Sequence, residues 1–344
     1  MSQQLMDTLL PLSQGMQLNN TQTLYEGAQL EMLKKELEML RLEHEEVTAT
    51  NNHLVSATFR ERDLKEKLQQ VVSQLKESKE IIEKQAIIER QNQLIRDSIK
   101  YAKRIQKAIV PSDQMIKRSF QNSGMFYKPK HTLSGDFPWL YTKVTDCYIG
   151  AVDCTGHGVP GAMLSMIGTS KLNELVQIGK LDPADLLNLL HSEVQKTLNP
   201  NQDSCCQDGM DVAICRVNYA KNELSFAGAH RPMLVLDGNE LIEIKGDRRA
   251  IGGVARGKRK FEPFVNHTLP LKKGMRVFMY SDGLPDQLNE DDSNKFSNRQ
   301  IKEIVMEQRN NSVSDTITTI KTAFHNWKGK ASQLDDVLLI GFEL

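Results

Sequence analysis

The sequence predicts an α+β fold, a layered sandwich of strands and helices that follows a long helical region. Residues 28–110 contain no Gly or Pro and are rich in Glu, Lys, Leu, Gln and Arg, which are good helix formers. After Pro111, short β-rich runs alternate with helical patterns. Several runs are joined by short polar links, as in antiparallel hairpins, and this favours α+β layers over a doubly wound parallel sheet.

The helical region is predicted to form a coiled coil over residues 28–96, after a flexible N-terminal segment of residues 1–27. Its apolar residues follow steps of three and four in two seams: Leu30, Leu33, Leu37, Leu40, Val47 and Leu54, then Leu64, Leu68, Val71, Leu75 and Ile82. The break between the seams indicates a stammer. Asn51 lies on the first seam and favours a parallel dimer in fixed register, so we expect a homodimer. Shorter helices that fold back on one another are the alternative.

Residues 97–113 are predicted to form a helical linker, whose helix ends at Pro111 because proline cannot continue a helix interior. Four apolar residues share one face of it: Ile99, Ala102, Ile105 and Ile109. Such a stripe must pack on something. It is either a switch that couples the coiled coil to the following domain or the first core helix of that domain.

The remaining 114–344 segment contains the predicted strands and helices of the sandwich. The strands are 147–153, 210–217, 223–229, 233–236, 276–282 and 335–344. The helices are 162–179, 183–198 and 298–310. The run RVNYAKNELSF, residues 216–226, predicts an antiparallel hairpin.

Charge and cysteine content exclude several classes of protein. Lys+Arg and Asp+Glu both total 44, so no basic field indicates a nucleic-acid partner. Five cysteines without C-x-x-C spacing argue against a zinc site or a disulfide framework and favour a reducing cytoplasm. We find no signal peptide and no apolar run of about 18 residues, so we expect a cytoplasmic protein without membrane insertion.

The stretch AVDCTGHGVPGA, residues 151–162, allows two interpretations. Gly156, Gly158 and Gly161 match the G-x-G-x-x-G fingerprint of dinucleotide-binding folds. That fold also needs an acidic residue after a second parallel strand about 20 residues later, and the available Glu174 lies in a helical pattern. The alternative interpretation is that Asp153, at the end of an apolar strand, is a metal ligand.

Repetition of the same arrangement favours the metal interpretation. Asp136 in LSGDF, Asp282 in RVFMYSDG and Asp335–Asp336 in DDVLLIGF also stand at predicted strand ends. Carboxylate oxygens are the ligands that Mg²⁺ and Mn²⁺ prefer, although a single Asp-Gly is more often a turn. Two bound divalent ions polarise phosphoryl oxygens and activate water for in-line attack.

The order SGDF, AVDCTGHGVPGAMLSM, QDGMDVAICRV, SFAGAHRPM, YSDG and DDVLLIGF resembles the bacterial SpoIIE/RsbU branch of the metal-dependent type 2C Ser/Thr protein phosphatases. The resemblance implies an α-β-β-α sandwich over residues 114–344 with two Mn²⁺ or Mg²⁺ ions. The implied ligands are Asp136, Asp153, Asp282 and Asp335, with Asp335 preferred to Asp336, and the carbonyl of Cys154 or Gly156. It also implies a phosphoserine or phosphothreonine substrate on a regulatory partner such as a STAS-type anti-sigma-factor antagonist. A catalytically silent coiled-coil scaffold that uses the fold for binding is the alternative function.

Further residues have two interpretations each. Lys130, with Lys128, is a candidate phosphate contact or a solvated lysine, and His157 is a leaving-group donor or a structural histidine. Asp208 and Asp211 are candidates for a third metal or for a turn cap, and we expect His230 to be structural. The sequence departs from the family pattern at Pro138, at Pro285 and at the run Lys295-Phe296-Ser297, where the substrate-facing flap is expected to differ.

Overall fold

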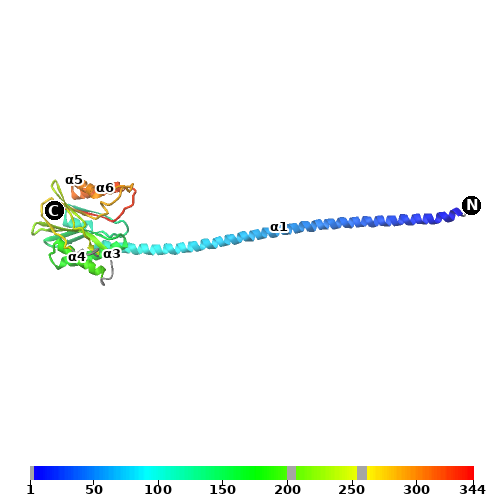
Figure 1. The fold of residues 1–344 in the computed structure, drawn as a ribbon, viewed down its shortest axis with the longest axis horizontal. Coiled ribbons are helices and arrows are strands. Elements are labelled where there is room, and N and C mark those ends of the chain that lie inside the picture. Colours follow the sequence, from blue (N-terminus) through cyan, green and yellow to red (C-terminus); the bar gives the residue numbers. More distant parts are fainter. Residues whose placement is uncertain (1–3, 200–206, 254–261) are drawn as a thin grey trace. The chain divides into compact units, whose positions relative to one another are not determined.

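The computed structural model describes residues 4–199, 207–253 and 262–344 (Figure 1). The chain forms two compact units, Met1–Gln91 and Asn92–Leu344. None of the helices in the described part combines the length and the apolar character that a membrane span requires.

The N-terminal unit is built from α1 (Gln4–Ile109), one uninterrupted helix that continues into the second unit. The fold-back alternative is therefore wrong for the described residues. The segment expected to be flexible is also helical from Gln4 onward, because it is rich in Leu, Met and Gln, which are good helix formers. Every apolar residue of the two seams is at least half exposed in the single chain. The seams therefore bury nothing within their own unit.

The second unit contains two antiparallel sheets. Its remaining helices are α2 (Asp113–Ser119), α3 (Val159–Ile178), α4 (Pro183–Leu198), α5 (Ser297–Glu307) and α6 (Val313–Lys328). Its strands are β1 (Ser123–Lys128), β2 (Phe137–Thr142), β3 (Asp146–Cys154), β4 (Gly209–Asn218), β5 (Glu223–Ala229), β6 (Met233–Asp237), β7 (Glu240–Ile244), β8 (Ile251–Gly252), β9 (His267–Pro270), β10 (Arg276–Tyr280) and β11 (Val337–Glu343). One sheet has the order β1-β11-β10-β6-β7, and the other has the order β2-β3-β4-β5-β9, with β8 paired to β4. The predicted hairpin is β4–β5, in which Asn218 pairs with Glu223.

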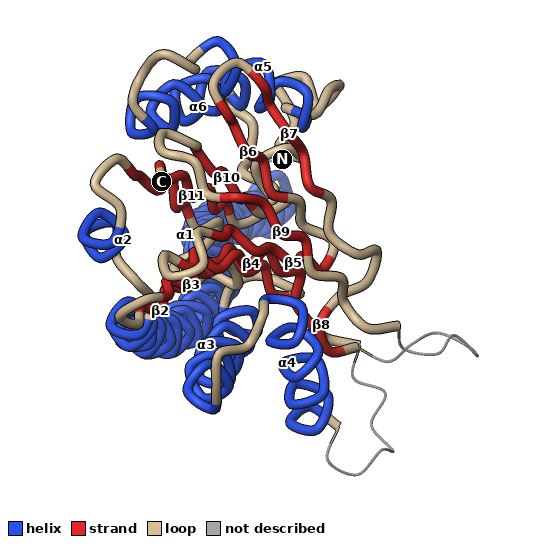
Figure 2. The backbone as a smooth tube through the Cα atoms, turned by 90° about the vertical axis from the view of Figure 1, so that its left-hand side faces the viewer, coloured by secondary structure: helices blue, strands red, loops and turns tan. Residues whose placement is uncertain are grey.

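Figure 2 shows the sandwich from its end, with α3 and α4 on one side of the sheets and α5 and α6 on the other. Three layers of buried apolar side chains fill the spaces between these elements. The first joins α3 and α4 to the β2–β5 sheet, the second lies between the two sheets, and the third joins α5 and α6 to the other sheet. This is the α+β sandwich, α-β-β-α, that the sequence predicts.

Alternation along β3 decides which side chains reach which layer. Ile149 and Ala151 point into the layer between the sheets, whereas Tyr148 and Val152 point toward α3 and α4. Asp153 lies two residues after Ala151 and four after Ile149, so its side chain points to the same face of the sheet as theirs. Its carboxylate therefore belongs to the end of the middle layer, between the two sheets.

The C-terminal turns of α1 contact the sandwich through a polar side chain. Gln106 is 6% exposed, and its Nε2 donates to Ser134 O (2.6 Å) and Ser165 Oγ (3.0 Å). The expected apolar contact is incomplete here, because Ile105 and Ile109 remain 40% and 41% exposed. Gln106 instead provides a hydrogen-bond partner for the buried Ser134 carbonyl and a second partner for the Ser165 hydroxyl, which also donates to Ala162 O (2.8 Å).

Candidate active site

Four aspartates predicted from the sequence lie at one end of the middle layer. Asp136 immediately precedes β2, Asp153 is the penultimate residue of β3, Asp282 follows β10 after Ser281, and Asp335 stands two residues before β11. The backbone N–H of Asp282 approaches Asp153 Oδ2 at 3.4 Å, which brings the two sheets together at this point.

The carboxylates repel one another, as the raised pKa values of Asp136, Asp153 and Asp335 indicate. Burial and the charge of Asp153 raise the pKa of Asp136 well above its ordinary value. Burial and the charge of Asp282 raise the pKa of Asp153 to about 7. Burial also raises the pKa of Asp335, and the charge of Asp282 adds to this effect. Asp136 Oδ2 is buried and has no hydrogen-bond partner within the described protein. Clusters of carboxylates with raised pKa values are typical of functional sites.

The two adjacent aspartates Asp335 and Asp336 differ in what they contact. Asp336 is 1% exposed, and its two carboxylate oxygens accept the backbone N–H groups of Lys130 and Gly135, both at 2.7 Å. It thereby fastens the loop that carries Asp136. Asp335 accepts only the neighbouring N–H of Asp336 (2.8 Å) and interacts with the charge of Asp282. Asp335 is accordingly the better candidate ligand of the pair.

The glycine-rich turn after Asp153 brings backbone segments into close contact. A Cβ on Gly161 would lie 2.2 Å from the carbonyl oxygen of Gly156, and one on Gly135 would lie 2.5 Å from the same oxygen. A Cβ on Gly283 would lie 1.9 Å from the carbonyl oxygen of Asp336. These glycines are therefore needed because the loops that carry the aspartates pack backbone against backbone. The Gly156 carbonyl lies inside this packed region, where it remains a candidate ligand.

A cationic side chain that the sequence analysis did not single out lies among the aspartates. Arg231 Nη2 donates to Asp282 Oδ2 (2.6 Å) and Asp211 Oδ2 (2.8 Å), and it lies 3.2 Å from Asp153 Oδ2. Burial lowers the pKa of Arg231, but the three carboxylates outweigh this, so its pKa is raised and it stays charged.

Two neighbours of Arg231 belong to the same group. Asp211 on β4 lies directly opposite Asp153 on β3, so the two like charges require a cation between them. Asp211 Oδ1 also binds His230 Nδ1 at 2.9 Å, and this hydrogen bond raises the pKa of His230. His230 holds a left-handed backbone conformation (φ 60°). The sequence gives one signal for the role of His230 and Arg231, a His-Arg-Pro run directly after an apolar strand.

The donor set fits a divalent cation by its chemistry. Carboxylate oxygens of Asp153, Asp211 and Asp282 converge on one point, which is occupied by Arg231 Nη2. The orphaned oxygen of Asp136 lies beside them, since Asp136 interacts with Asp153. In the part of the chain that the structure describes, no group of three or more Asp, Glu, His or Cys side chains, this cluster included, is already arranged to hold a metal ion.

The other predicted residues lie around this centre or apart from it. His157 interacts electrostatically with Asp335, and its ring lies 4.7 Å from that of His131. Lys128 approaches His325 of α6 (3.4 Å) instead of the carboxylates. Asp211 of the predicted pair forms an ion pair with Arg231 in the site, whereas Asp208 is exposed and its backbone carbonyl accepts Gly253 N–H (3.1 Å).

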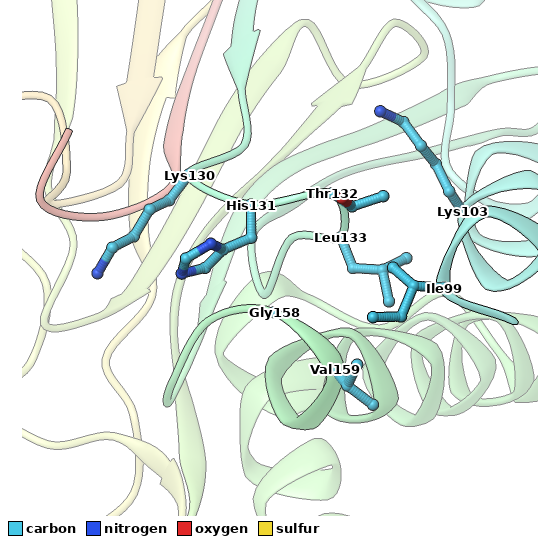
Figure 3. A pocket seen from close by; sticks show the side chains of 8 residues that line it. All are labelled: Ile99, Lys103, Lys130, His131, Thr132, Leu133, Gly158 and Val159. Atoms are coloured by element: carbon cyan, nitrogen blue, oxygen red, sulfur yellow. The ribbon is translucent and has the colours of Figure 1, made fainter. Parts of the chain in front are cut away.

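A basic pocket of about 600 Å³ lies beside the site (Figure 3). It is lined by Lys103 near the end of α1, by residues 130–133 and by Gly158 and Val159 at the start of α3. Figure 3 shows the side chains of Lys130 and His131 together on one side of it. Lys130 connects the pocket to the centre, because its backbone N–H is bound by Asp336.

The family model described as Stage II sporulation protein E (SpoIIE) matches residues 145–344, more than half of the chain. The chain belongs to the SpoIIE family. The match includes Asp153, Asp282 and Asp335 and begins after Asp136.

Solved structures agree with this assignment. The SiaA-PP2C domain of Pseudomonas aeruginosa is 27% identical, with a TM-score of 0.66 over 74% of this chain and 98% of that one. The PP2C phosphatase domain of SpoIIE from Bacillus subtilis, solved with a fragment of its regulatory domain, is 14% identical, with a TM-score of 0.51 over 64% of this chain and 61% of that one. The second likeness concerns the fold alone. The comparison with curated proteins gives no match. The chain is a serine/threonine phosphatase of the PP2C type.

Proposed function

We propose that this phosphatase uses divalent metal ions, Mn²⁺ or Mg²⁺, to hydrolyse phosphoserine or phosphothreonine on a regulatory partner protein. The observation that carries the proposal is the cluster of carboxylates at the end of the middle layer. Asp136, Asp153, Asp282 and Asp335 interact with one another there: the charge of a neighbouring aspartate helps to raise the pKa values of Asp136, Asp153 and Asp335, and Asp136 Oδ2 lacks a hydrogen-bond partner in the described protein. Such repulsion is unfavourable unless cations offset it.

The same aspartates would hold the two ions. When bound, divalent ions supply electrostatic stabilisation to a phosphoryl group and activate water. The chain's own contribution is positional: Asp336 holds the Asp136 loop through Lys130 and Gly135, and Gly283 lets the Asp282 loop pack against Asp336. Lys130, which lines the pocket, and His157, which interacts with Asp335, are proposed to contact the phosphoryl group or the leaving oxygen.

The proposed partner is a phosphorylated regulator such as a STAS-type anti-sigma-factor antagonist, in keeping with the SpoIIE family. The chain itself is proposed to act as a parallel homodimer in the cytoplasm. The exposed seams of α1 support the dimer, and the buried free thiols of Cys147, Cys154 and Cys215 support a reducing compartment. Gln106 supports regulation through the coiled coil, since it joins α1 to the loop that leads to Asp136.

The activity is tested with the full chain on phosphoserine, phosphothreonine and phosphotyrosine peptides, with Mn²⁺ or Mg²⁺ and with excess chelator. We expect metal-dependent phosphate release from the first two peptides. Asp282→Asn should abolish it. The control Asp286→Asn should not, because Asp286, four residues after Asp282, pairs with Lys295 at the surface. Equal rates in Asp282→Asn and wild type would contradict the proposal.

The dimer is tested by light scattering on the full chain. We expect a dimer for the wild type and a monomer when Leu37 and Leu68, one from each seam, are both changed to Asp. Leu42 is equally exposed but lies off the seams, so Leu42→Asp should remain dimeric. A monomeric wild type at micromolar concentration would contradict the coiled coil.

A further inference from the structure

Arg231 occupies the point at which a cation would bind. A single nitrogen, Nη2, lies 2.6, 2.8 and 3.2 Å from oxygens of Asp282, Asp211 and Asp153. The three carboxylates come from the two different sheets. Apart from His230 on Asp211, Arg231 is the basic side chain that forms ion pairs with this trio in the described chain.

The guanidinium and a metal ion cannot share this position. Mg²⁺ binds carboxylate oxygens at about 2.0–2.1 Å. A nitrogen 2.6–3.2 Å from those same oxygens would then lie almost on the ion, and both groups are positively charged. Metal binding therefore requires the Arg231 side chain to leave.

The backbone around Arg231 is held by hydrogen bonds, whereas its side chain is bound only through the guanidinium end in the described protein. The backbone turn is fixed by the hydrogen bonds of Arg231 N–H to Ala229 O (2.7 Å) and of His230 N–H to Asp247 O (2.8 Å). The Nε of Arg231 is buried without a hydrogen-bond partner in the described protein. The side chain thus depends on the three carboxylates, and nothing else in the turn retains it.

We propose that Arg231 is an internal counter-cation that competes with the catalytic metal: it neutralises Asp153, Asp211 and Asp282 in the metal-free enzyme and is displaced when a divalent ion binds. This inference rests on the proposed metal dependence. Under this inference, one residue in the turn between β5 and β6 sets the affinity of the site for metal. Removing the guanidinium should strengthen metal binding and weaken the metal-free fold.

The test is calorimetric titration of Mn²⁺ into full-length wild type and Arg231→Gln, with melting curves in excess chelator. We expect Arg231→Gln to bind Mn²⁺ about tenfold more tightly, within the usual range of coupling between two ligands, and to melt at a lower temperature without metal. The control is Arg276→Gln. Arg276 is 15% exposed against 16% for Arg231 and also pairs with a carboxylate, Glu343 at 2.9 Å, but away from the site. It should lose stability without any change in Mn²⁺ affinity.

Equal or weaker Mn²⁺ binding by Arg231→Gln overturns the inference. If that variant does not fold without metal, side-chain NMR of the wild type decides, with the Arg231 guanidinium signal assigned by its loss in Arg231→Lys. Addition of Mg²⁺ should release the restrained guanidinium, and an unchanged signal in metal-saturated protein overturns the inference. If the wild type hydrolyses phosphopeptides with metal but Arg231→Gln binds Mn²⁺ no more tightly than the wild type, only this inference is refuted. A wild type that binds no metal refutes the proposed function as well.

Discussion

The two ends of β3 carry aspartates in opposite electrostatic situations. At the first end, Asp146 is 1% exposed and accepts Arg216 Nε (2.8 Å), while Arg216 Nη1 reaches Asp182 (2.8 Å). Burial would raise the pKa of Asp146, but the hydrogen bonds from Thr145 and Arg216 outweigh it, so its pKa is lowered. At the other end, burial and the charge of Asp282 raise the pKa of Asp153 to about 7.

This difference separates stability from function within one strand. At the Asp146 end each buried charge has a partner, so removing either partner would leave an unpaired buried charge and destabilise the fold. At the Asp153 end three carboxylates share one cation, Arg231, and the unfavourable charge is retained. Carboxylate clusters with raised pKa values are typical of functional sites, which is why we propose the Asp153 end as the site.

The largest expected effect is on catalysis at the Asp153 end. Asp153→Asn should lower phosphate release at least about a hundredfold, because a lost metal ligand removes several kcal/mol of transition-state stabilisation. Its melting temperature in chelator should not fall, since one repelling charge is removed. Phosphate release and thermal melting measure both. Retention of more than about a tenth of the wild-type rate would contradict the site.

The next effect is on stability at the Asp146 end. Asp146→Asn leaves the buried Arg216 without its main partner and should lower the free energy of unfolding by about 3 kcal/mol. Asp182→Asn, at the 52% exposed end of the same network, should lower it by less than about 1 kcal/mol. Denaturant unfolding measures both. An Asp146→Asn protein as stable as the wild type would show that the ion pair does not stabilise this end.

The pH dependence of metal-free stability should differ between the two ends. The pKa of Asp153 is raised in the folded state, so its contribution is favourable at low pH and is lost as pH rises toward about 7. The pKa of Asp146 is lowered, so its contribution is present above pH 4 and is lost as pH falls through the folded pKa.

Melting curves from pH 3 to pH 8 in chelator test this. The stability of the wild type relative to Asp153→Asn should fall between about pH 4 and about pH 7. Relative to Asp146→Asn, it should fall only below about pH 4. If the melting temperatures of the wild type and Asp153→Asn change in parallel with pH, the neighbours of Asp153 do not raise its pKa.

The smallest effect concerns the contact between α1 and the site. Gln106→Ala removes the hydrogen bonds to Ser134 and Ser165 and should cost about 1–2 kcal/mol of stability, with a several-fold lower kcat. The control is Lys143→Met, near the Asp146 end, where Lys143 Nζ donates to Val176 O (2.7 Å). It should lose similar stability and keep kcat. Equal kcat changes in the two variants would contradict a specific link from α1 to the Asp136 loop.

The sequence predicts the aspartates of the site because each stands at one end of a predicted strand: Asp153 and Asp282 follow apolar runs, and Asp136 and Asp335 precede them. The hairpin at residues 218–223 is also predicted, because a short polar link joins two strand-like runs. The sequence does not reveal Arg231, because nothing local distinguishes an arginine in a turn from a solvated one. Its role exists only because the β5–β6 turn lies beside the ends of β3 and β10.

Helix α6 was also missed, for a different reason. Its sequence VSDTITTIKTAFHNWK is rich in Thr and Ile, which favour strands by propensity. The structure makes it a helix because Val313, Ile317, Ile320 and Phe324 share one face and pack on the β1–β7 sheet. Ser312 supplies the cap by accepting the N–H of Asp315 (3.1 Å). Burial of apolar residues at every third or fourth position thus outweighs the strand propensity of the individual residues.

The most direct test of the central claim is phosphate release from a phosphoserine peptide by the full chain, measured with Mn²⁺ and with excess chelator, in wild type and Asp153→Asn. The claim is that the Asp153 end of β3 is a metal centre that hydrolyses phosphoproteins. It predicts release by the wild type with Mn²⁺, none with chelator, and none by Asp153→Asn in either condition. Undiminished release by the wild type in chelator, or by Asp153→Asn with Mn²⁺, would contradict it.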